Sequence, residues 1–247
     1  MRISKSYSVL AAVLALGLGF AGRASATVVL TDTTIGTNPG PSSAVYNAAN
    51  GTYSITINGT SSETEAYRNF DYATVQGDFT AVVNVLLPSS NSTSTTFLGG
   101  LAVRNVIPGV ISSTPASAEV GFETSNGATV ALYDDCNNGV CSTNAVNVTP
   151  TSTMEVSLNR SGSWFTEAYS TDGRTFHTLA YQQLPLASQA YLGLSTMSYN
   201  QSTATTVYSN LSGINPVSAV PGPGSAGLLT AALLGMLLLK RKTVGLS

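Results

Sequence analysis

The chain has 247 residues, of which only 9% are charged, and its formal net charge is −2. All twelve acidic residues but only four of the ten basic ones lie between residues 27 and 218, so this region has a formal charge of −8 and no lysine. An acidic region without lysine is not suited to neutralise phosphate groups, which disfavours nucleic acid as a partner class. The same charge repels acidic polysaccharides unless a cation bridges the two.

The first 26 residues have the layout of a secretory signal peptide. Arg2 and Lys5 precede the apolar run Val9–Phe20, and Ala24–Ala26 follows as a small-residue cleavage site. The apolar run is short for a membrane span, which disfavours an uncleaved anchor. We therefore expect cleavage after Ala26 and a β-domain over residues 27–214.

Residues 27–214 show the pattern of β-strands, with no helical periodicity and with turn residues in many gaps. The clearest segment is Met154–Tyr181, which predicts three strands joined by tight turns at Ser161–Ser163 and at Asp172–Gly173. About eleven short strands in a region of this length favour a β-sandwich over a barrel or an α/β fold. The predicted strands are Val28–Leu30, Tyr53–Ile57, Phe79–Leu87, Thr96–Arg104, Ser117–Glu123, Thr129–Tyr133, Met154–Asn159, Trp164–Ser170, Thr175–Tyr181, Ala190–Met197 and Thr205–Ile214.

Several of these segments resemble a family of bacterial concanavalin A-like sandwich domains, which are related to laminin-G-type and legume-lectin folds. The resemblance covers most of Gly51–Ile214 and implies an all-β jelly-roll sandwich. It also implies a place among extracellular or carbohydrate-associated proteins, without a particular activity. The segments that carry it are Gly51–Ile55, Phe70–Val83, Gly99–Arg104, Leu158–Gly162, Tyr169–Gly173 and Tyr191–Leu194.

The two cysteines of the chain, Cys136 and Cys141, are close together in the sequence. An even cysteine count in an exported protein predicts a disulfide, here one that closes a short loop. Asp134, Asp135 and Asn137 beside them offer oxygen atoms that suit calcium. These residue types are also ordinary in turns, so we predict no cofactor and keep calcium as an alternative.

A candidate catalytic pair is formed by Glu119 and Glu123, which share one face of a predicted strand with Gly121. Retaining glycosidases on concanavalin A-like sandwiches use a similar Glu-x-Asp-x-Glu strand, in which one carboxylate attacks and the other donates a proton. Gly121 stands where that pattern has aspartate. We therefore predict no catalytic site and keep a glycoside hydrolase or lyase as an alternative. Arg104 could instead pair with either glutamate.

Aromatic residues are the candidate sugar contacts. Trp164 and Phe165 are neighbours on one strand, so one of them faces the core and the other the surface. Burial of large aromatics favours Trp164 in the core, but Trp164 and Tyr133 are both candidates for stacking on a sugar ring. Further tyrosines near predicted loops are Tyr72, Tyr181 and Tyr199.

The C-terminal end has three features in order: Val220-Pro221-Gly222-Pro223, the apolar run Ser225–Leu239, and the basic cluster Lys240–Lys242. As a helix the apolar run would measure roughly 22 Å, less than the ~30 Å hydrocarbon core. The order resembles the PEP-CTERM sorting signal of Gram-negative bacteria, with Gly222 in place of glutamate. It implies a Pro/Gly linker at 215–224, a membrane helix at 225–242 that an exosortase removes, and a short tail at 243–247.

Together these features predict an exported protein of the cell surface or extracellular matrix of a Gram-negative bacterium. Its expected role is noncatalytic, either structural or carbohydrate-associating, with polysaccharide or other matrix components as partners. Before processing it would contact the membrane through the C-terminal helix. The alternative to a glycan partner is a protein-binding adhesin that uses exposed sheet edges.

Overall fold

The structure is a computed structural model that describes residues 28–35, 42–58, 67–87, 97–107, 116–125, 127–138, 140–198 and 203–217. The predicted signal peptide with its cleavage site at Ala26, the motif at Val220, Pro221, Gly222 and Pro223, and the C-terminal apolar run lie outside these residues. Within the described ranges no helix is long and apolar enough to cross a membrane.

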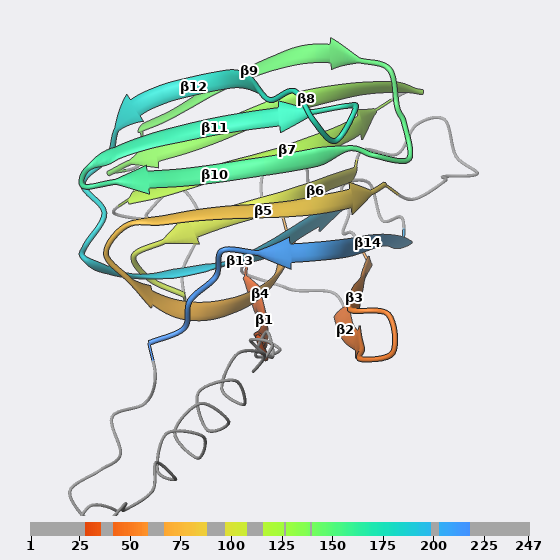
Figure 1. The fold of residues 1–247 in the computed structure, drawn as a ribbon, viewed down its shortest axis with the longest axis horizontal. Helices are drawn as coiled ribbons and strands as arrows, with labels where there is room; N and C mark the ends of the chain where they lie inside the picture. Colours follow the sequence, from red (N-terminus) through yellow and green to blue (C-terminus); the bar gives the residue numbers. More distant parts are fainter. Residues whose placement is uncertain are drawn as a thin grey trace, which may run out of the picture.

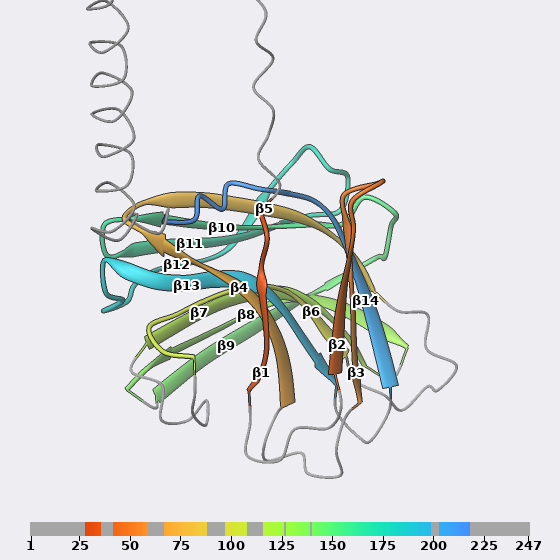
Figure 2. The same ribbon diagram turned by 90° about the horizontal axis from the view of Figure 1, so that it is seen from below.

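The described residues form fourteen strands in two antiparallel sheets of seven strands each. Sheet A has the order β1-β4-β13-β6-β7-β8-β9, and sheet B has the order β12-β11-β10-β5-β14-β3-β2. Figure 1 shows sheet B in front of sheet A, and Figure 2 shows β5, β10 and β11 as one layer over β6, β7 and β8. The strands are β1 (Thr31–Ile35), β2 (Ser42–Asn47), β3 (Thr52–Asn58), β4 (Tyr67–Gln76), β5 (Phe79–Leu86), β6 (Phe97–Arg104), β7 (Ala116–Ser125), β8 (Ala128–Asn137), β9 (Val140–Val148), β10 (Glu155–Ser161), β11 (Trp164–Ser170), β12 (His177–Gln183), β13 (Gln189–Ser198) and β14 (Thr203–Ser212).

The core lies between the two sheets and follows from period-2 alternation along the strands. In β5 the side chains of Ala81, Val83 and Val85 are buried, and the residues between them face outward. The inward residues of β10, Val156 and Leu158, join the same apolar cluster. The all-β two-sheet sandwich predicted from the sequence is therefore confirmed.

Four strands were not predicted, namely β1, β2, β4 and β9. The predicted strand Val28–Leu30 is wrong, because these residues precede β1, which begins at Thr31. Strand β9 lies at the edge of sheet A, and most of its residues are exposed and polar, so it lacks an alternating apolar face. Strand β4 lies inside sheet A and is buried on both faces. Its polar residues interrupt the apolar alternation by which a strand is predicted from the sequence.

Two glycines allow close backbone approach in the middle of sheet A. A Cβ atom at Gly193 in β13 would overlap the carbonyl oxygen of Asp71 in β4. A Cβ atom at Gly100 in β6 would overlap the carbonyl oxygen of Val120 in β7. Both strands are therefore restricted to glycine at these positions.

Candidate functional site

A group of charged side chains gathers on the outer face of sheet A, the side that points away from sheet B. Arg68 comes from β4, Arg104 from β6, Glu119 from β7 and Asp134 from β8. Each alternates with side chains that enter the core, such as Val120 in β7, so the pleat directs the charged groups outward. Arg68 and Arg104 are two of the four basic residues between residues 27 and 218.

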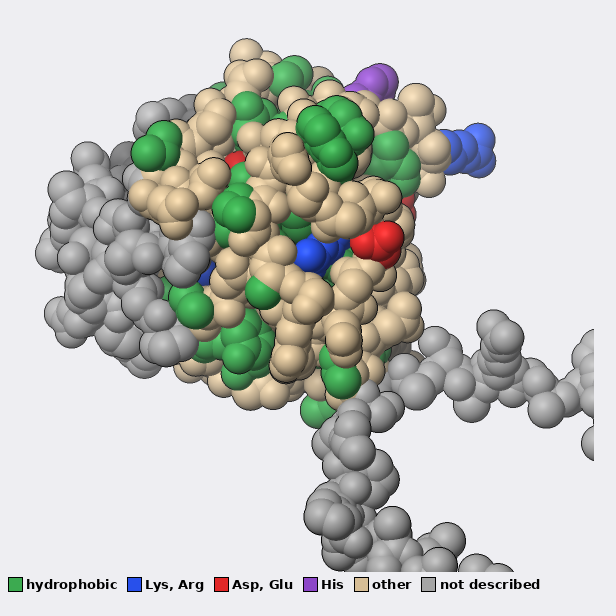
Figure 3. Space-filling view, turned by 90° about the vertical axis from the view of Figure 1, so that its left-hand side faces the viewer, with side chains coloured by type: hydrophobic (Ala, Val, Ile, Leu, Met, Phe, Trp, Pro, Cys, Tyr) green, Lys and Arg blue, Asp and Glu red, His purple; other side chains and the backbone are tan. Residues whose placement is uncertain are grey.

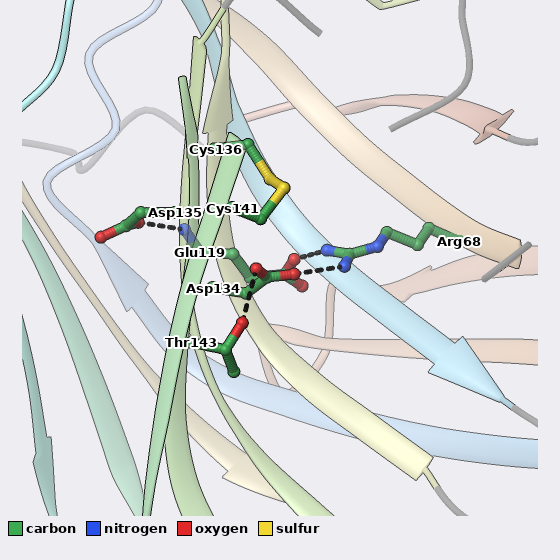
Figure 4. The surroundings of a disulfide bond; sticks show 7 residues. All are labelled: Arg68, Glu119, Asp134, Asp135, Cys136, Cys141 and Thr143. Carbon is green, nitrogen blue, oxygen red and sulfur yellow. Dashed lines mark hydrogen bonds and ion pairs between the residues drawn. A yellow bond between two sulfur atoms is a disulfide. The ribbon is translucent and has the colours of Figure 1, made fainter. Parts of the chain in front are cut away.

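Arg68 holds this group together. Its guanidinium forms an ion pair with Glu119, and its Nη2 donates to Oδ2 of Asp134 at 3.4 Å (Figure 4). The hydroxyl of Thr143 in β9 donates to the other oxygen of Asp134 at 3.0 Å. Arg68 and Glu119 are only 7% and 2% exposed, so the pair is desolvated and removal of one partner would leave a buried charge.

A small cavity opens beside this ion pair. Among the described residues, some cavity-lining side chains carry polar atoms without a hydrogen-bond partner, including Nε of Arg68, Oε1 of Glu119 and Oγ of Ser195. Buried polar atoms in folded proteins are nearly always paired, so a donor, an acceptor and a hydroxyl on side chains that line one cavity indicate a place for a polar group from outside the chain.

Aromatic rings lie next to the cavity on the same face. Phe70, which lines the cavity, stacks on Tyr72 with ring centroids 5.5 Å apart, and Tyr72 meets the edge of Tyr191 at 5.3 Å. Phe70 is buried, whereas Tyr72 and Tyr191 are half-buried and extend the apolar cluster toward the surface. A hydrogen-bonding cavity thus adjoins an aromatic surface.

Arg68 was not predicted as a site residue, whereas Arg104 was the arginine expected to pair with Glu119 or Glu123. In the structure Glu119 forms its ion pair with Arg68 in β4, which lies 51 positions earlier in the chain. Arg104 also lines the cavity, and its burial, together with the nearby charge of Arg68, lowers its pKa to about 10. A pairing across non-consecutive strands has no local signal in the sequence.

Glu119 and Glu123 share the outer face of β7, as the strand alternation predicts. Their Cα atoms are roughly 13 Å apart along the strand, so a catalytic pair would need both side chains to lean toward a common space. Glu119 is instead held by Arg68. Glu123 is opposite Leu98 in β6 and Val130 in β8 and is not among the described residues that line the cavity. Burial raises the pKa of Glu123, but no shared cleft joins it to Glu119.

The predicted disulfide between Cys136 and Cys141 is confirmed and joins β8 to the edge strand β9. The oxygen atoms proposed as calcium ligands do not lie on one face of the strand. Asp134, Asp135 and Asn137 lie in β8 rather than in a loop, and Asp134 and Asp135 point to opposite faces (Figure 4). One ion could not bind both carboxylates, and the nearby sulfur atoms are bonded to each other rather than available as thiolates.

Asp135 belongs to the interior of the sandwich. One of its oxygens accepts a hydrogen bond from the backbone N–H of Glu119 at 3.3 Å. Across the core, the carboxyl group of Glu167 in β11 is fully buried. Burial raises the pKa of Glu167 to about 8, and burial with the charges of Glu167 and Asp134 raises the pKa of Asp135 to about 9.

The aromatic residues proposed as sugar contacts do not lie together on one side of the molecule. Phe165 is fully buried, and Trp164 is 43% exposed on sheet B, so the expectation of Trp164 in the core was wrong. Trp164 stacks on Tyr181, with ring centroids 4.8 Å apart and planes inclined by 10°. Tyr133 is half-buried and within 3.4 Å of the hydroxyl of Ser142, and Tyr199 lies outside the described residues.

Neither a protein-family model nor a curated protein matches the sequence. Among solved structures, a functionally unknown protein from Saccharomyces cerevisiae is similar, with a TM-score of 0.59, 16% sequence identity, and coverage of 77% of this chain and 98% of the yeast chain. The carbohydrate-binding module CBM66 from Bacillus subtilis has a TM-score of 0.44, 12% identity and coverage of 74% and 95%. An alginate lyase from Klebsiella pneumoniae has a TM-score of 0.42, 6% identity and coverage of 71% and 85%. The yeast likeness supports the sandwich fold, and function has to be argued from the site itself.

Proposed function

We propose that this protein is an exported, noncatalytic β-sandwich that associates with carbohydrate through the outer face of sheet A. The observation that carries the proposal is the cavity beside the Arg68–Glu119 ion pair. There, a donor on Arg68, an acceptor on Glu119 and the hydroxyl of Ser195 are buried without partners among the described residues. Two half-buried tyrosines, Tyr72 and Tyr191, adjoin it.

A sugar hydroxyl fits these groups because it both donates and accepts. It accepts from Nε of Arg68 and donates to Oε1 of Glu119, and Ser195 can take either role. The tyrosine rings offer an apolar surface to the C–H face of a sugar ring. The cavity is small, so a hydroxyl-bearing arm enters it while the ring remains on the aromatic surface. A neutral sugar is favoured because the region from 27 to 218 has a formal charge of −8.

The proposal is noncatalytic because the two glutamates do not converge. A glycosidase needs one carboxyl group as acid and a second as nucleophile or base, with both facing the bond that breaks. The buried ion pair with Arg68 holds Glu119, and Glu123 lies outside the cavity lining. A substrate in the cavity would therefore meet one carboxylate that is already paired.

The cellular part of the proposal rests on the ends of the chain. The disulfide supports folding in an oxidising compartment, which agrees with the predicted signal peptide. We further propose the concanavalin A-like jelly-roll class, and sorting by an exosortase through the motif at residues 220–223. The destination would be the envelope or matrix of a Gram-negative bacterium, with transient membrane contact through the C-terminal helix.

Retention on a polysaccharide panel tests the proposal. The purified protein is incubated with insoluble or immobilised glycans, with calcium and with chelator, and the supernatants are assayed for released sugars. We expect retention on neutral glycans, without sugar release and without dependence on calcium. Sugar release that Glu119→Gln or Glu123→Gln abolishes would replace the proposal by the glycosidase alternative. Retention of a protein but of no glycan would replace it by the adhesin alternative.

A further inference from the structure

The outer face of sheet B, the side that points away from sheet A, is almost free of charge. On β3, β5, β10 and β14 the outward positions are mostly serine, threonine and asparagine, for example Thr56, Asn84, Ser157 and Thr205. Glu155 at the beginning of β10 is the one formal charge among the described outward side chains of the seven strands. Among the described residues, this leaves a broad and nearly uncharged surface on the strands of sheet B.

Four side chains form a row that crosses this face at right angles to the strands. Thr80 in β5 is opposite Asn159 in β10, Asn159 is opposite Thr166 in β11, and Thr166 is opposite Tyr181 in β12. Three strand spacings make the row roughly 14 Å long. Nδ2 of Asn159 donates to the hydroxyl of Thr80 at 2.6 Å and to the backbone carbonyl of Phe79 at 3.2 Å, so the first two members of the row are held in place.

An aromatic pair stands at the end of the row. Tyr181 is 64% exposed and stacks on Trp164, which is itself 43% exposed and opposite Gln183 in the adjacent strand. Mutual stacking orders both rings, and both remain partly exposed. Figure 3 views the molecule from the left-hand side of Figure 1, where hydrophobic side chains stand out among polar ones and a few charged side chains lie between them. Rigid exposed aromatic groups of this kind are typical anchors in binding surfaces.

We propose that this face binds a neutral polysaccharide chain that lies across strands β5, β10, β11 and β12. Trp164 and Tyr181 stack on its rings, and the amide oxygen of Asn159 and the hydroxyl of Thr166 bond to its hydroxyl groups. Charge selects the occupant, because hydroxyl and amide groups match an uncharged chain, whereas the formal charge of −8 over residues 27–218 repels an acidic one. The proposal rests on the glycan association proposed above and adds a second site on the opposite side of the sandwich.

Two sites on opposite faces would let one molecule bridge two polysaccharide chains. Neither site needs the other for its contacts, because one is built from sheet A and the other from sheet B. Binding to a long polymer would therefore gain from both sites, whereas each site alone would bind more weakly.

Affinity electrophoresis of the purified protein tests the second site. Native gels contain hydroxyethylcellulose, glucomannan or dextran as neutral probes, or alginate as the acidic probe. The variants are Trp164→Ala with Tyr181→Ala and, as a matched control, Phe176→Ala, which removes a 40% exposed aromatic ring near the opposite end of β12. Circular dichroism and thermal melting check that each variant is folded.

We expect retardation by at least one neutral polysaccharide, about tenfold weaker binding in the double variant, and unchanged binding in Phe176→Ala. Equal retardation of the double variant and the parent protein would overturn the second site. If Ser195→Ala weakens binding while the double variant does not, the second site fails and the sheet A proposal stands. Retardation by alginate alone would overturn the neutral class. If the parent protein binds no glycan but self-associates, and the double variant does not self-associate, the glycan site is overturned and the face is a contact between copies of this chain.

Discussion

The buried carboxyl groups inside the sandwich make the stability of this protein depend on pH in an unusual direction. Glu167 is fully buried in β11, and neither of its side-chain oxygens has a hydrogen-bond partner within the described ranges. Asp135 in β8 is 2% exposed. The folded-state pKa values of about 8 and about 9 lie well above those of exposed carboxyl groups, because burial penalises the charged form.

A raised pKa means that the folded protein holds protons which the unfolded chain releases. Between about pH 4, where exposed carboxyl groups titrate, and about pH 8, the folded state binds more protons, so stability falls as the pH rises. Each such group contributes a slope of about 1.4 kcal/mol per pH unit. From pH 5 to pH 8 one group costs about 4 kcal/mol, an order-of-magnitude figure. Asp71, with a pKa raised to about 7 by burial and by the charge of Asp32, acts in the same direction.

The substitution Glu167→Gln isolates one of these groups. The amide has the same shape and does not titrate, so the free energy of unfolding should fall less steeply with pH in the variant. Its stability relative to the parent protein should improve by up to about 4 kcal/mol between pH 5 and pH 8. Asp135→Asn should flatten the profile in the same way. Urea unfolding followed by circular dichroism at several pH values measures both. Equal slopes for the parent protein and Glu167→Gln would refute the reasoning.

Three further changes probe the packing. Phe165→Ala should lower the free energy of unfolding by about 3–5 kcal/mol, because its ring is in the core. Trp164→Ala should lower it by under about 1 kcal/mol, because its ring is at the surface. Equal losses of stability in urea unfolding would contradict the burial of these two rings. Gly193→Ala should abolish folding or lower the melting temperature sharply, because its Cβ would overlap the backbone of β4, so an unchanged melting temperature would contradict the close approach. Joint substitution of Cys136 and Cys141 by serine should cost under about 3 kcal/mol, since the closed loop is short. Faster hydrogen exchange should be confined to β9 and its contact with β8, and loosening of the central strands would contradict this.

Local pattern was enough to predict the β10–β11–β12 meander and the disulfide. The meander has clean alternation and tight turns, and the structure places its strands at Glu155–Ser161, Trp164–Ser170 and His177–Gln183. The two cysteines are only five positions apart in the sequence, so their pairing across β8 and β9 needs no distant contact.

Features that depend on distant strands could not be predicted. Alternation places Trp164 and Phe165 on opposite faces, but Phe165 shares its face with Glu167, and an acidic neighbour would ordinarily mark the outward side. Here the carboxyl group is buried, and its raised pKa favours the neutral form. The site on sheet A likewise depends on β4, which places Arg68 beside Glu119 in β7. Neither strand's own sequence indicates the order of the strands in the sheet.

The most direct test of the glycan proposal compares the parent protein with Ser195→Ala by calorimetric titration, using the neutral glycan that the panel retains. The substitution removes one hydroxyl from the cavity and no apolar packing. A lost neutral hydrogen bond is worth about 0.5–1.5 kcal/mol, so affinity should fall about two- to tenfold. Without glycan, the free energy of unfolding should be unchanged or higher, because a buried hydroxyl without a partner has been removed. Unchanged affinity, or weaker binding that is matched by an equal loss of stability, would contradict a glycan site at this cavity.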